Sequence, residues 1–197
     1  MTRKIDALMA DIRDLENQLE EEFEARRAAF HYHFKKNRVV FSEEVKRQHK
    51  ALKTQLWAYV RHARLPLVLS APVIYSLIIP FALLDLFVTV YQAVCFPVYG
   101  IPKVPRKDYI VVDRIRLGYL NGLEKLNCAY CGYCNGLLAY VVEIASRTEQ
   151  YWCPIKHARR IEGTHRHYVE FVDYGDAQTY RDKLADLRTA LRQKPEK

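Results

Sequence analysis

LPLVLSAPVIYSLIIPFALLDLFVTVYQAVCFPVYGIP, residues 65–102, is the stretch that decides how this chain is built. It lies between Arg64 and Lys103, and its one charged residue is Asp85. As a single helix it would be roughly 57 Å long at about 1.5 Å per residue, whereas the hydrocarbon core of a bilayer is only about 30 Å thick. The stretch is therefore too long for one straight span and too short for two full spans with a loop.

Two of the prolines lie well inside this stretch, Pro72 and Pro80. Pro72 and Pro80 each lack a backbone N–H, and each ring crowds the preceding helical turn. We therefore expect a kink or break between Ser76 and Pro80, with shorter arms at residues 67–79 and 81–98.

The flanks of the stretch are basic on both sides. The basic residues are Arg61, Arg64, Lys103, Arg106 and Lys107. Basic residues close to a membrane segment tend to remain cytoplasmic, and matched flanks give no asymmetry that would orient a crossing. The pattern favours a re-entrant or interfacial hairpin with both ends on one side. A single kinked span and a buried soluble core are the alternatives that the length leaves open.

Asp85 needs an explanation of its own, because a carboxylate at membrane depth is costly and usually faces protein or water. It could serve as a proton or ligand site. It could instead lie near the interface, or cap the second arm after the break at Pro80. The mouth of a hairpin is a polar place, so we favour the second interpretation.

The charge and the cysteine content indicate the surroundings of the chain. Its formal net charge is +8, which beside a membrane segment favours contact with anionic lipid headgroups, and no nucleic-acid-binding signature is visible. The first residues are charged and lack the apolar region of a signal peptide, so insertion would depend on the internal stretch. Five cysteines without a regular framework argue against a secreted disulfide scaffold and predict soluble parts that face the cytoplasm.

Residues 4–23 predict a helix with an apolar seam, because large apolar residues recur at alternating steps of three and four. The seam consists of Ile5, Leu8, Ile12, Leu15 and Leu19, with Phe23 and Phe30 as extensions. This spacing is typical of a short coiled coil, which would join a protein partner or a second copy in a homo-oligomer. Packing of the helix on its own domain is the alternative, and the small number of heptads leaves both open.

Three local patterns are informative elsewhere. Ser42 precedes two glutamates and predicts the start of a helix, and Asp176 predicts the N-cap of a final amphipathic helix. His31 and His33 would share a face on a strand and could hold a metal, but their aromatic and basic surroundings are more typical of a surface patch.

The chain contains a short internal repeat, the hexapeptides Gly118–Leu123 and Gly132–Leu137. They differ at one position and start 14 residues apart. That separation is close to four helical turns, so both copies would share one face of a helix from about Leu117 to Arg147. Each copy contains Gly-x-x-x-Gly, which lets a second helix approach closely.

The cysteines of the same region indicate a metal site. Cys128, Cys131 and Cys134, with Cys153 before a proline, follow the ligand order of a ferredoxin-type iron–sulfur cluster. A zinc site is the second possibility. Cys128, Cys131 and Cys153 with His157 would make a closed set of three thiolates and one imidazole. The zinc set suits a straight helix, whereas the iron–sulfur set needs the helix to unwind at its glycines.

Two interpretations without a metal also remain open. The thiols could be buried and unliganded, with Cys134 packing in the place that Leu120 holds in the first hexapeptide. Cys153 could also form a nucleophilic thiolate–imidazole pair with His157, His165 or His167. Nothing local indicates an oxyanion hole or a substrate pocket, so no catalytic residue is identified.

Together these patterns predict a mainly α, membrane-anchored protein with three regions. They are a helical arm at 1–64, a membrane-embedded hairpin or kinked span at 65–102, and a Cys/His-bearing cytosolic unit at 103–197 that ends in an amphipathic helix. One function that fits is a membrane-anchored metalloprotein, acting in electron transfer if it holds an iron–sulfur cluster. The other is a non-catalytic scaffold or assembly subunit of a membrane complex, with structural zinc or no metal.

Overall fold

The computed structural model describes residues 3–28, 32–35, 38–61 and 64–193, and the chain is mainly helical as predicted. It divides into two compact units. Unit 1 consists of Met1–Arg61 and Asp113–Lys125, and unit 2 consists of His62–Val112 and Leu126–Lys197. The apolar stretch and most of the C-terminal region therefore belong to the same unit.

Unit 1 contains three whole α-helices, a small sheet, the short 3-10 turn Arg114–Arg116 and the first residues of the helix that begins at Gly122. The helices are α1 (Arg3–Ala28), α2 (Glu43–Ala51) and α3 (Leu56–Arg61), and β1 (Tyr32–Lys35) pairs antiparallel with β2 (Arg38–Phe41). The predicted start of α2 is confirmed, because the Ser42 hydroxyl accepts the Val45 N–H at 3.4 Å. His31 and Phe30 lie outside the described residues, and His33 lies in β1.

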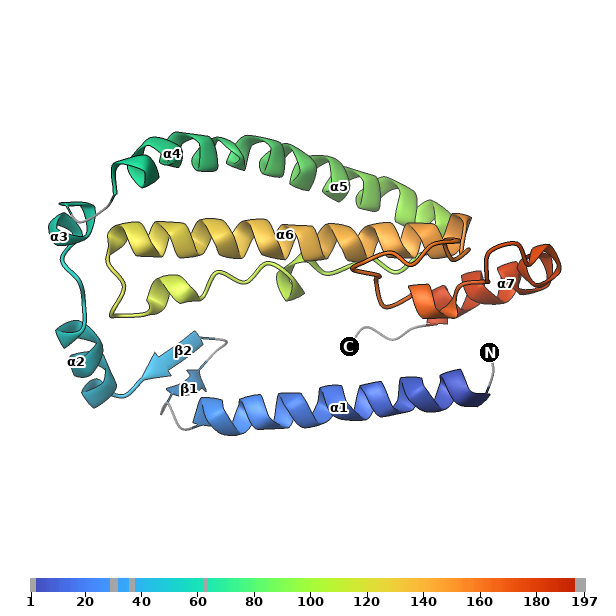
Figure 1. Cartoon of the computed structure of the whole chain (residues 1–197), viewed down its shortest axis with the longest axis horizontal. Coiled ribbons are helices and arrows are strands. Elements are labelled where there is room, and N and C mark those ends of the chain that lie inside the picture. Colours follow the sequence, from blue (N-terminus) through green and yellow to red (C-terminus); the bar gives the residue numbers. More distant parts are fainter. Residues whose placement is uncertain (1–2, 29–31, 36–37, 62–63, 194–197) are drawn as a thin grey trace. The chain divides into compact units, whose positions relative to one another are not determined.

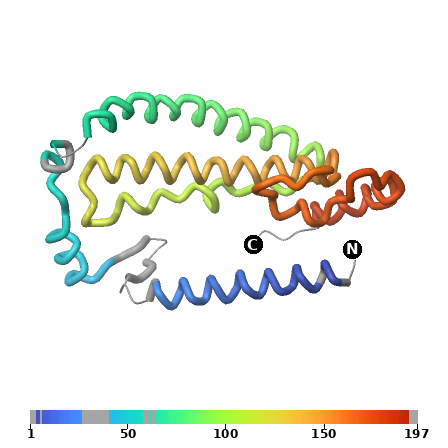
Figure 2. Tube along the Cα trace, viewed as in Figure 1, coloured from blue at the N-terminus to red at the C-terminus, as the bar shows by residue number. Residues whose placement is uncertain are grey.

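Unit 2 is built around one long helix, α6 (Gly122–Trp152). α4 (Leu65–Ser76) and α5 (Ile78–Tyr99) run beside it, and residues 101–112 return along it without regular helix or strand except for one short turn (Figure 1). The same path is visible in the trace (Figure 2), where the green segment lies beside the yellow helix. The buried core of this unit consists of Phe96, Ile101, Val104, Leu137, Tyr140, Ile144 and Leu191.

The break predicted in the apolar stretch is confirmed at Leu77, between α4 and α5. Pro80 has no N–H to donate to Ser76, which removes the helical hydrogen bond at that turn. Leu77 itself stays close to helical geometry at φ −62° and ψ −15°, so the chain keeps its direction. α4 and α5 therefore follow one another along one bent path rather than fold back on each other (Figure 1), and the hairpin expected from the sequence is not formed.

α6 begins later than the sequence predicts. Asn121 caps it, because its Oδ1 accepts the N–H groups of Leu123 and Glu124 at 3.0 Å, while Glu124 accepts the Asn121 N–H at 2.8 Å. This reciprocal capping box fixes the first turn at Gly122. The helix runs five residues beyond the predicted end at Arg147, to Trp152. Gly118 consequently lies before the helix, so the two repeated hexapeptides do not share a helical face.

The second Gly-x-x-x-Gly pair has an unexpected neighbour. A Cβ on Gly136 would lie 2.5 Å from the Tyr109 carbonyl oxygen and 2.9 Å from the Ile110 Cα, and one on Gly132 would lie 3.2 Å from the Val111 oxygen. The glycines thus admit the backbone of residues 109–111 rather than a second helix. The close approach was predicted correctly, but its partner was not.

The final helix, α7 (Ala177–Gln193), starts at the predicted N-cap. The Asp176 carboxylate accepts the Thr179 N–H at 3.0 Å, and this hydrogen bond lowers the pKa of Asp176. α7 packs on the end of α6, where Gln150 donates to the Leu187 carbonyl and Arg188 donates to the Tyr151 carbonyl. The expectation for Lys194 to Lys197 concerns residues outside the described part of the chain.

Candidate membrane-facing surface

α5 has one face turned toward the rest of unit 2. Side chains on this face recur every three or four residues, as a helix that packs along one side requires. They are Phe81, Leu84, Asp85, Val88, Tyr91, Gln92, Cys95, Phe96 and Tyr99, all buried or half-buried. This is also the face on which the helix carries its most strongly polar side chains, Asp85 and Gln92.

The opposite face of α5 is apolar and at least half exposed. It consists of Ile79, Leu83, Leu86, Phe87, Val90, Val94 and Val98, whose exposed fractions run from 50% at Leu83 to 78% at Val98. A surface helix of a water-soluble protein places charged and polar side chains in these positions. α5 therefore has its polar groups turned inward and its large apolar groups turned outward.

Asp85 is held in an ion pair on the inner face. Arg106 donates from Nη2 to Oδ2 at 2.6 Å and from Nε to Oδ1 at 3.2 Å, and the Tyr133 hydroxyl donates to Oδ2 at 3.0 Å. A two-point contact of this kind is among the stronger charge-assisted pairs. Asp85 lies about two turns inside α5, so it does not cap the helix after Pro80. Its carboxylate is occupied by structural contacts.

Gln92 makes the second inward polar contact. Its side-chain oxygen accepts the Val104 N–H at 2.6 Å, and its Nε2 donates to the Val104 carbonyl and to the Tyr140 hydroxyl at 2.9 Å. The Gln92 side-chain amide thus pairs with the backbone of Val104 as a neighbouring strand would. Gln92 and Arg106 together attach residues 101–112 to α5.

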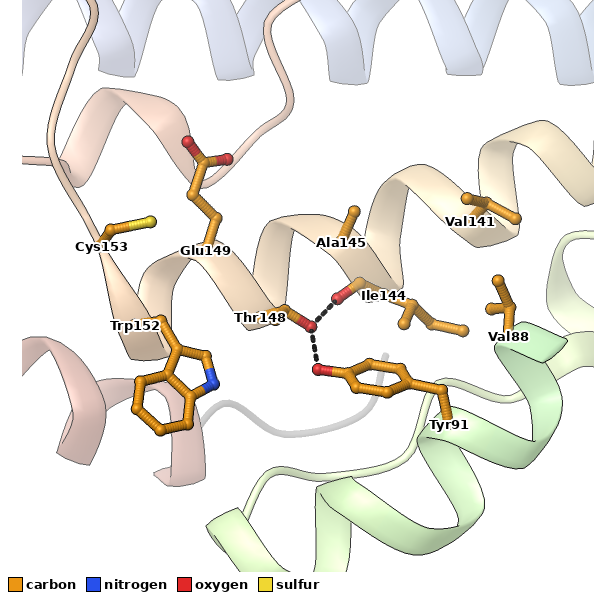
Figure 3. A pocket seen from close by; sticks show the side chains of 9 residues that line it. All are labelled: Val88, Tyr91, Val141, Ile144, Ala145, Thr148, Glu149, Trp152 and Cys153. Atoms are coloured by element: carbon orange, nitrogen blue, oxygen red, sulfur yellow. Dashed lines mark hydrogen bonds between the residues drawn. The ribbon is translucent and has the colours of Figure 1, made fainter. Parts of the chain in front are cut away.

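A groove of about 390 Å³ lies between α5 and α6 (Figure 3). Tyr91 of α5 crosses it and shares a 3.0 Å hydrogen bond with Thr148 of α6, and Trp152 stands at one end. Both helices carry exposed apolar side chains, some at the groove and others beyond it. We call this set the apolar face, and it consists of Phe87, Val94 and Val98 of α5 with Leu138, Val142 and Trp152 of α6.

A charged cluster lies near the C-terminal end of α6. Glu143 is 5% exposed, and its Oε1 accepts from Arg147 at 2.8 Å, from Arg166 and from the buried His167. Glu149 pairs with His165 at 3.0 Å. These contacts join α6 to the loop that follows it. Each of the two histidines, His165 and His167, is paired with a carboxylate on α6.

The predicted metal ligands are not gathered in one place. Cys128, Cys131 and Cys134 lie on α6, and Cys153 follows its end, so the helix separates Cys128 from Cys153 by roughly 37 Å. Cys134 is 6% exposed, while Cys131 and Cys153 are exposed. Among the described residues, no three His, Cys, Asp or Glu side chains form a group that could hold a metal.

His157 has other neighbours. Its ring stacks on that of Tyr168 at 6.0 Å, and its backbone N–H donates to the Tyr168 hydroxyl. The iron–sulfur and zinc hypotheses stay predictions, and either would require α6 to unwind between Cys128 and Cys153. The nucleophile hypothesis also stays a prediction, with His165 and His167 paired to carboxylates.

The described chain contains two helical stretches that are long and apolar enough to span a membrane, Leu65–Tyr99 and Gly122–Trp152. They are the stretches that carry the apolar face. Comparison with known families, curated proteins and solved structures found no match to this chain.

Proposed function

We propose that the protein is a membrane-anchored, non-catalytic assembly subunit that lies in the plane of the bilayer on its apolar face. The observation that carries this proposal is the distribution of side chains on α5, with Asp85 and Gln92 inward and Phe87, Val94 and Val98 outward. An exposed apolar surface of this length favours contact with lipid or with another protein. Lipid is the simpler occupant for a helix whose exposed large side chains are all apolar.

The returning segment supports an in-plane arrangement over a crossing. Residues 101–112 lack continuous helix, and they carry charged side chains at Lys103, Arg106, Lys107 and Asp108. Irregular backbone facing lipid within the hydrocarbon leaves N–H and C=O groups unsatisfied, and charges there add a further cost. If α5 and α6 crossed the bilayer, this segment would have to cross beside them. If unit 2 lies along the bilayer surface, residues 101–112 do not have to enter the hydrocarbon.

The length of the apolar stretch agrees with this orientation. Leu65–Tyr99 is 35 residues long, or about 52 Å, well beyond the roughly 30 Å hydrocarbon thickness. A helix that lies along the interface has no such length limit. The exposed Lys103 and Lys107 would then contact anionic headgroups on the cytoplasmic leaflet, which is consistent with the net charge of +8.

The assembly role rests on α1. Its apolar seam is exposed from Ile5 to Phe23, and a membrane anchor would concentrate that seam at a surface where a binding partner can meet it. This half of the proposal corresponds to a scaffold function, in which the chain holds another protein at the bilayer and catalyses no reaction itself.

Vesicle flotation with variants of the apolar face tests the proposed membrane contact. Phe87→Glu with Val94→Glu places two carboxylates in the proposed lipid contact, at a cost of up to about 3 kcal/mol each if fully immersed. We expect the wild-type chain to float with vesicles that contain anionic lipid and the double variant to remain mostly in the soluble fraction. Both side chains are exposed, so folding should be unaffected, and circular dichroism checks this.

The matched control is Tyr174→Glu. Tyr174 is 70% exposed and lies in the turn before α7, on neither of the two helices that carry the apolar face. It should float like the wild type. Equal flotation of the Phe87→Glu/Val94→Glu variant and the control would contradict the proposed contact between the apolar face and the membrane.

A further inference from the structure

The groove between α5 and α6 has walls that offer few hydrogen bonds to an occupant. Its two hydroxyl groups belong to Tyr91 and Thr148, which are hydrogen-bonded to one another at 3.0 Å (Figure 3). Thr148 donates its proton to the Ile144 carbonyl at 2.8 Å, so Tyr91 is the donor between the two hydroxyls. A polar occupant would lose its hydrogen bonds with water in this part of the groove and gain few in return, whereas an alkyl chain has none to lose.

The groove is elongated, and its two ends differ in polarity. The α6 residues that line it run over positions 141–153, roughly 18 Å along the helix axis. One end is aliphatic, where Val141 lies near Val88 of α5, and the other end carries Glu149 and Trp152 (Figure 3). A hydrocarbon tail suits the first end and a polar group suits the second, and a lipid molecule has these two parts.

Trp152 connects the groove with the apolar face, because it belongs to both. When the apolar face contacts a bilayer, the groove is therefore open to lipid. Indole rings are enriched at the level of the headgroups in membrane proteins. The Trp152 end of the groove is thus the end at which a lipid headgroup fits.

We propose that the groove holds one acyl chain of a membrane phospholipid, with the headgroup at the Trp152 end. The groove volume of about 390 Å³ lies within the roughly 300–1,000 Å³ of sites that bind small molecules. Because α5 and α6 both contact this chain, it is held more strongly than the lipids elsewhere along the apolar face. The inference rests on the proposed membrane contact and adds a defined lipid site to it.

Tryptophan fluorescence measures the lipid in this groove. The chain has two tryptophans, and Trp57→Phe leaves Trp152 as the only one. Trp57 lies on α3 and is 74% exposed, so its replacement should leave the fold unchanged. The full-length variant is titrated in detergent micelles with phosphatidylcholine that carries bromine atoms on one acyl chain, since bromine quenches an indole only at short range. We expect quenching that saturates near one lipid per protein chain and is stronger with bromines close to the headgroup than with bromines at the chain end.

Two alanine variants in the Trp57→Phe background separate the groove from the rest of the surface. Ala145 is exposed and lines the groove, so Ala145→Phe should fill the groove and abolish the saturable quenching. Ala139 is also exposed on α6 but does not line the groove, so Ala139→Phe makes the same change outside it and should keep the saturable quenching. Circular dichroism checks that both variants fold.

Several results would overturn the inference. Quenching that rises in proportion to the lipid content of the micelle, without saturation, would show that Trp152 meets only bulk lipid. Equal quenching of Ala145→Phe and Ala139→Phe would show that the lipid contacts Trp152 outside the groove. Stronger quenching by bromines at the chain end would contradict the placement of the headgroup. Weak quenching by brominated lipid, together with protection of Trp152 from aqueous iodide, would show that protein rather than lipid covers the groove.

The proposed membrane contact and the lipid site fail in different experiments. A chain that floats with vesicles but shows no saturable quenching keeps the membrane contact and loses the lipid site. A chain that shows saturable quenching in micelles but does not float keeps the lipid site and loses the membrane contact.

Discussion

The pair of Asp85 and Arg106 is the single contact that most directly attaches the returning segment to α5. Asp85 is largely shielded, with 14% of its side chain exposed, whereas Arg106 is 46% exposed. A shielded carboxylate that loses its cation is left with an uncompensated charge. The residue that the sequence marked as an anomaly is therefore one that holds the fold together.

Removing the cation should destabilise the protein. We expect Arg106→Met to lower the free energy of unfolding by about 2 kcal/mol, less than for a fully buried pair because Arg106 is partly solvated. Thermal unfolding in detergent measures the change. Lys107→Met removes an exposed neighbouring cation and should have little effect. Adding Asp85→Asn to Arg106→Met should recover part of the loss, and a loss that is unchanged would contradict the charge-pair explanation.

Gly136 supports the segment at a second point. An alanine methyl group there would meet the Tyr109 backbone at 2.5 Å, a distance that requires residues 109–110 to move. We expect Gly136→Ala to lower the free energy of unfolding by about 1–3 kcal/mol through overpacking. Gly122→Ala is the control, because a Cβ at Gly122 meets no atom within 4 Å. That change should be neutral or slightly stabilising, and equal loss in both variants would contradict the proposed close packing.

At the scale of elements, features with local causes could be predicted from the sequence. The break near Pro80, the start of α2 at Ser42 and the start of α7 after Asp176 each depend on residues within one helical turn. The amphipathic seam of α1 depends on spacing alone. Such signals are read correctly because no distant partner is needed to produce them.

Features with distant causes could not be predicted in the same way. Gly132 and Gly136 indicate that another segment packs closely on α6. They do not indicate that this segment is non-helical, because its identity depends on the path of residues 109–111. The pairing of Asp85 with Arg106 and of Gln92 with Val104 likewise depends on the path after α5. The sequence signal that did exist was a single acidic residue in an apolar run followed by a nearby arginine.

The cysteines illustrate the same limit. Spacing of three residues is compatible with a helix or with a metal-binding loop, and the choice depends on whether α6 is continuous. The Asn121–Glu124 capping box and the packing of Gly136 on Tyr109 favour a continuous helix. Because α6 is continuous, Cys128 and Cys153 lie far apart along it. The local spacing of the cysteines does not indicate this separation.

In the proposed arrangement of the whole molecule, unit 2 lies in the membrane plane, and the charged segment 101–112 stays out of the hydrocarbon, at the level of the headgroups. Three observations support this arrangement of unit 2. α5 is apolar on its outer side, its polar groups hold a charged segment, and that segment has no continuous helix with which to cross a bilayer. An in-plane anchor satisfies all three.

Sided cysteine labelling tests this claim most directly. Thr54→Cys precedes α4 and Lys103→Cys follows α5, each introduced alone after replacement of the five native cysteines. A membrane-impermeant maleimide is applied to sealed vesicles of both orientations, and detergent-opened vesicles report the full signal. Both sites should react from the same side, the cytoplasmic one. Labelling of Thr54→Cys from one side and Lys103→Cys from the other would show that α4 and α5 cross the bilayer, and would contradict this arrangement.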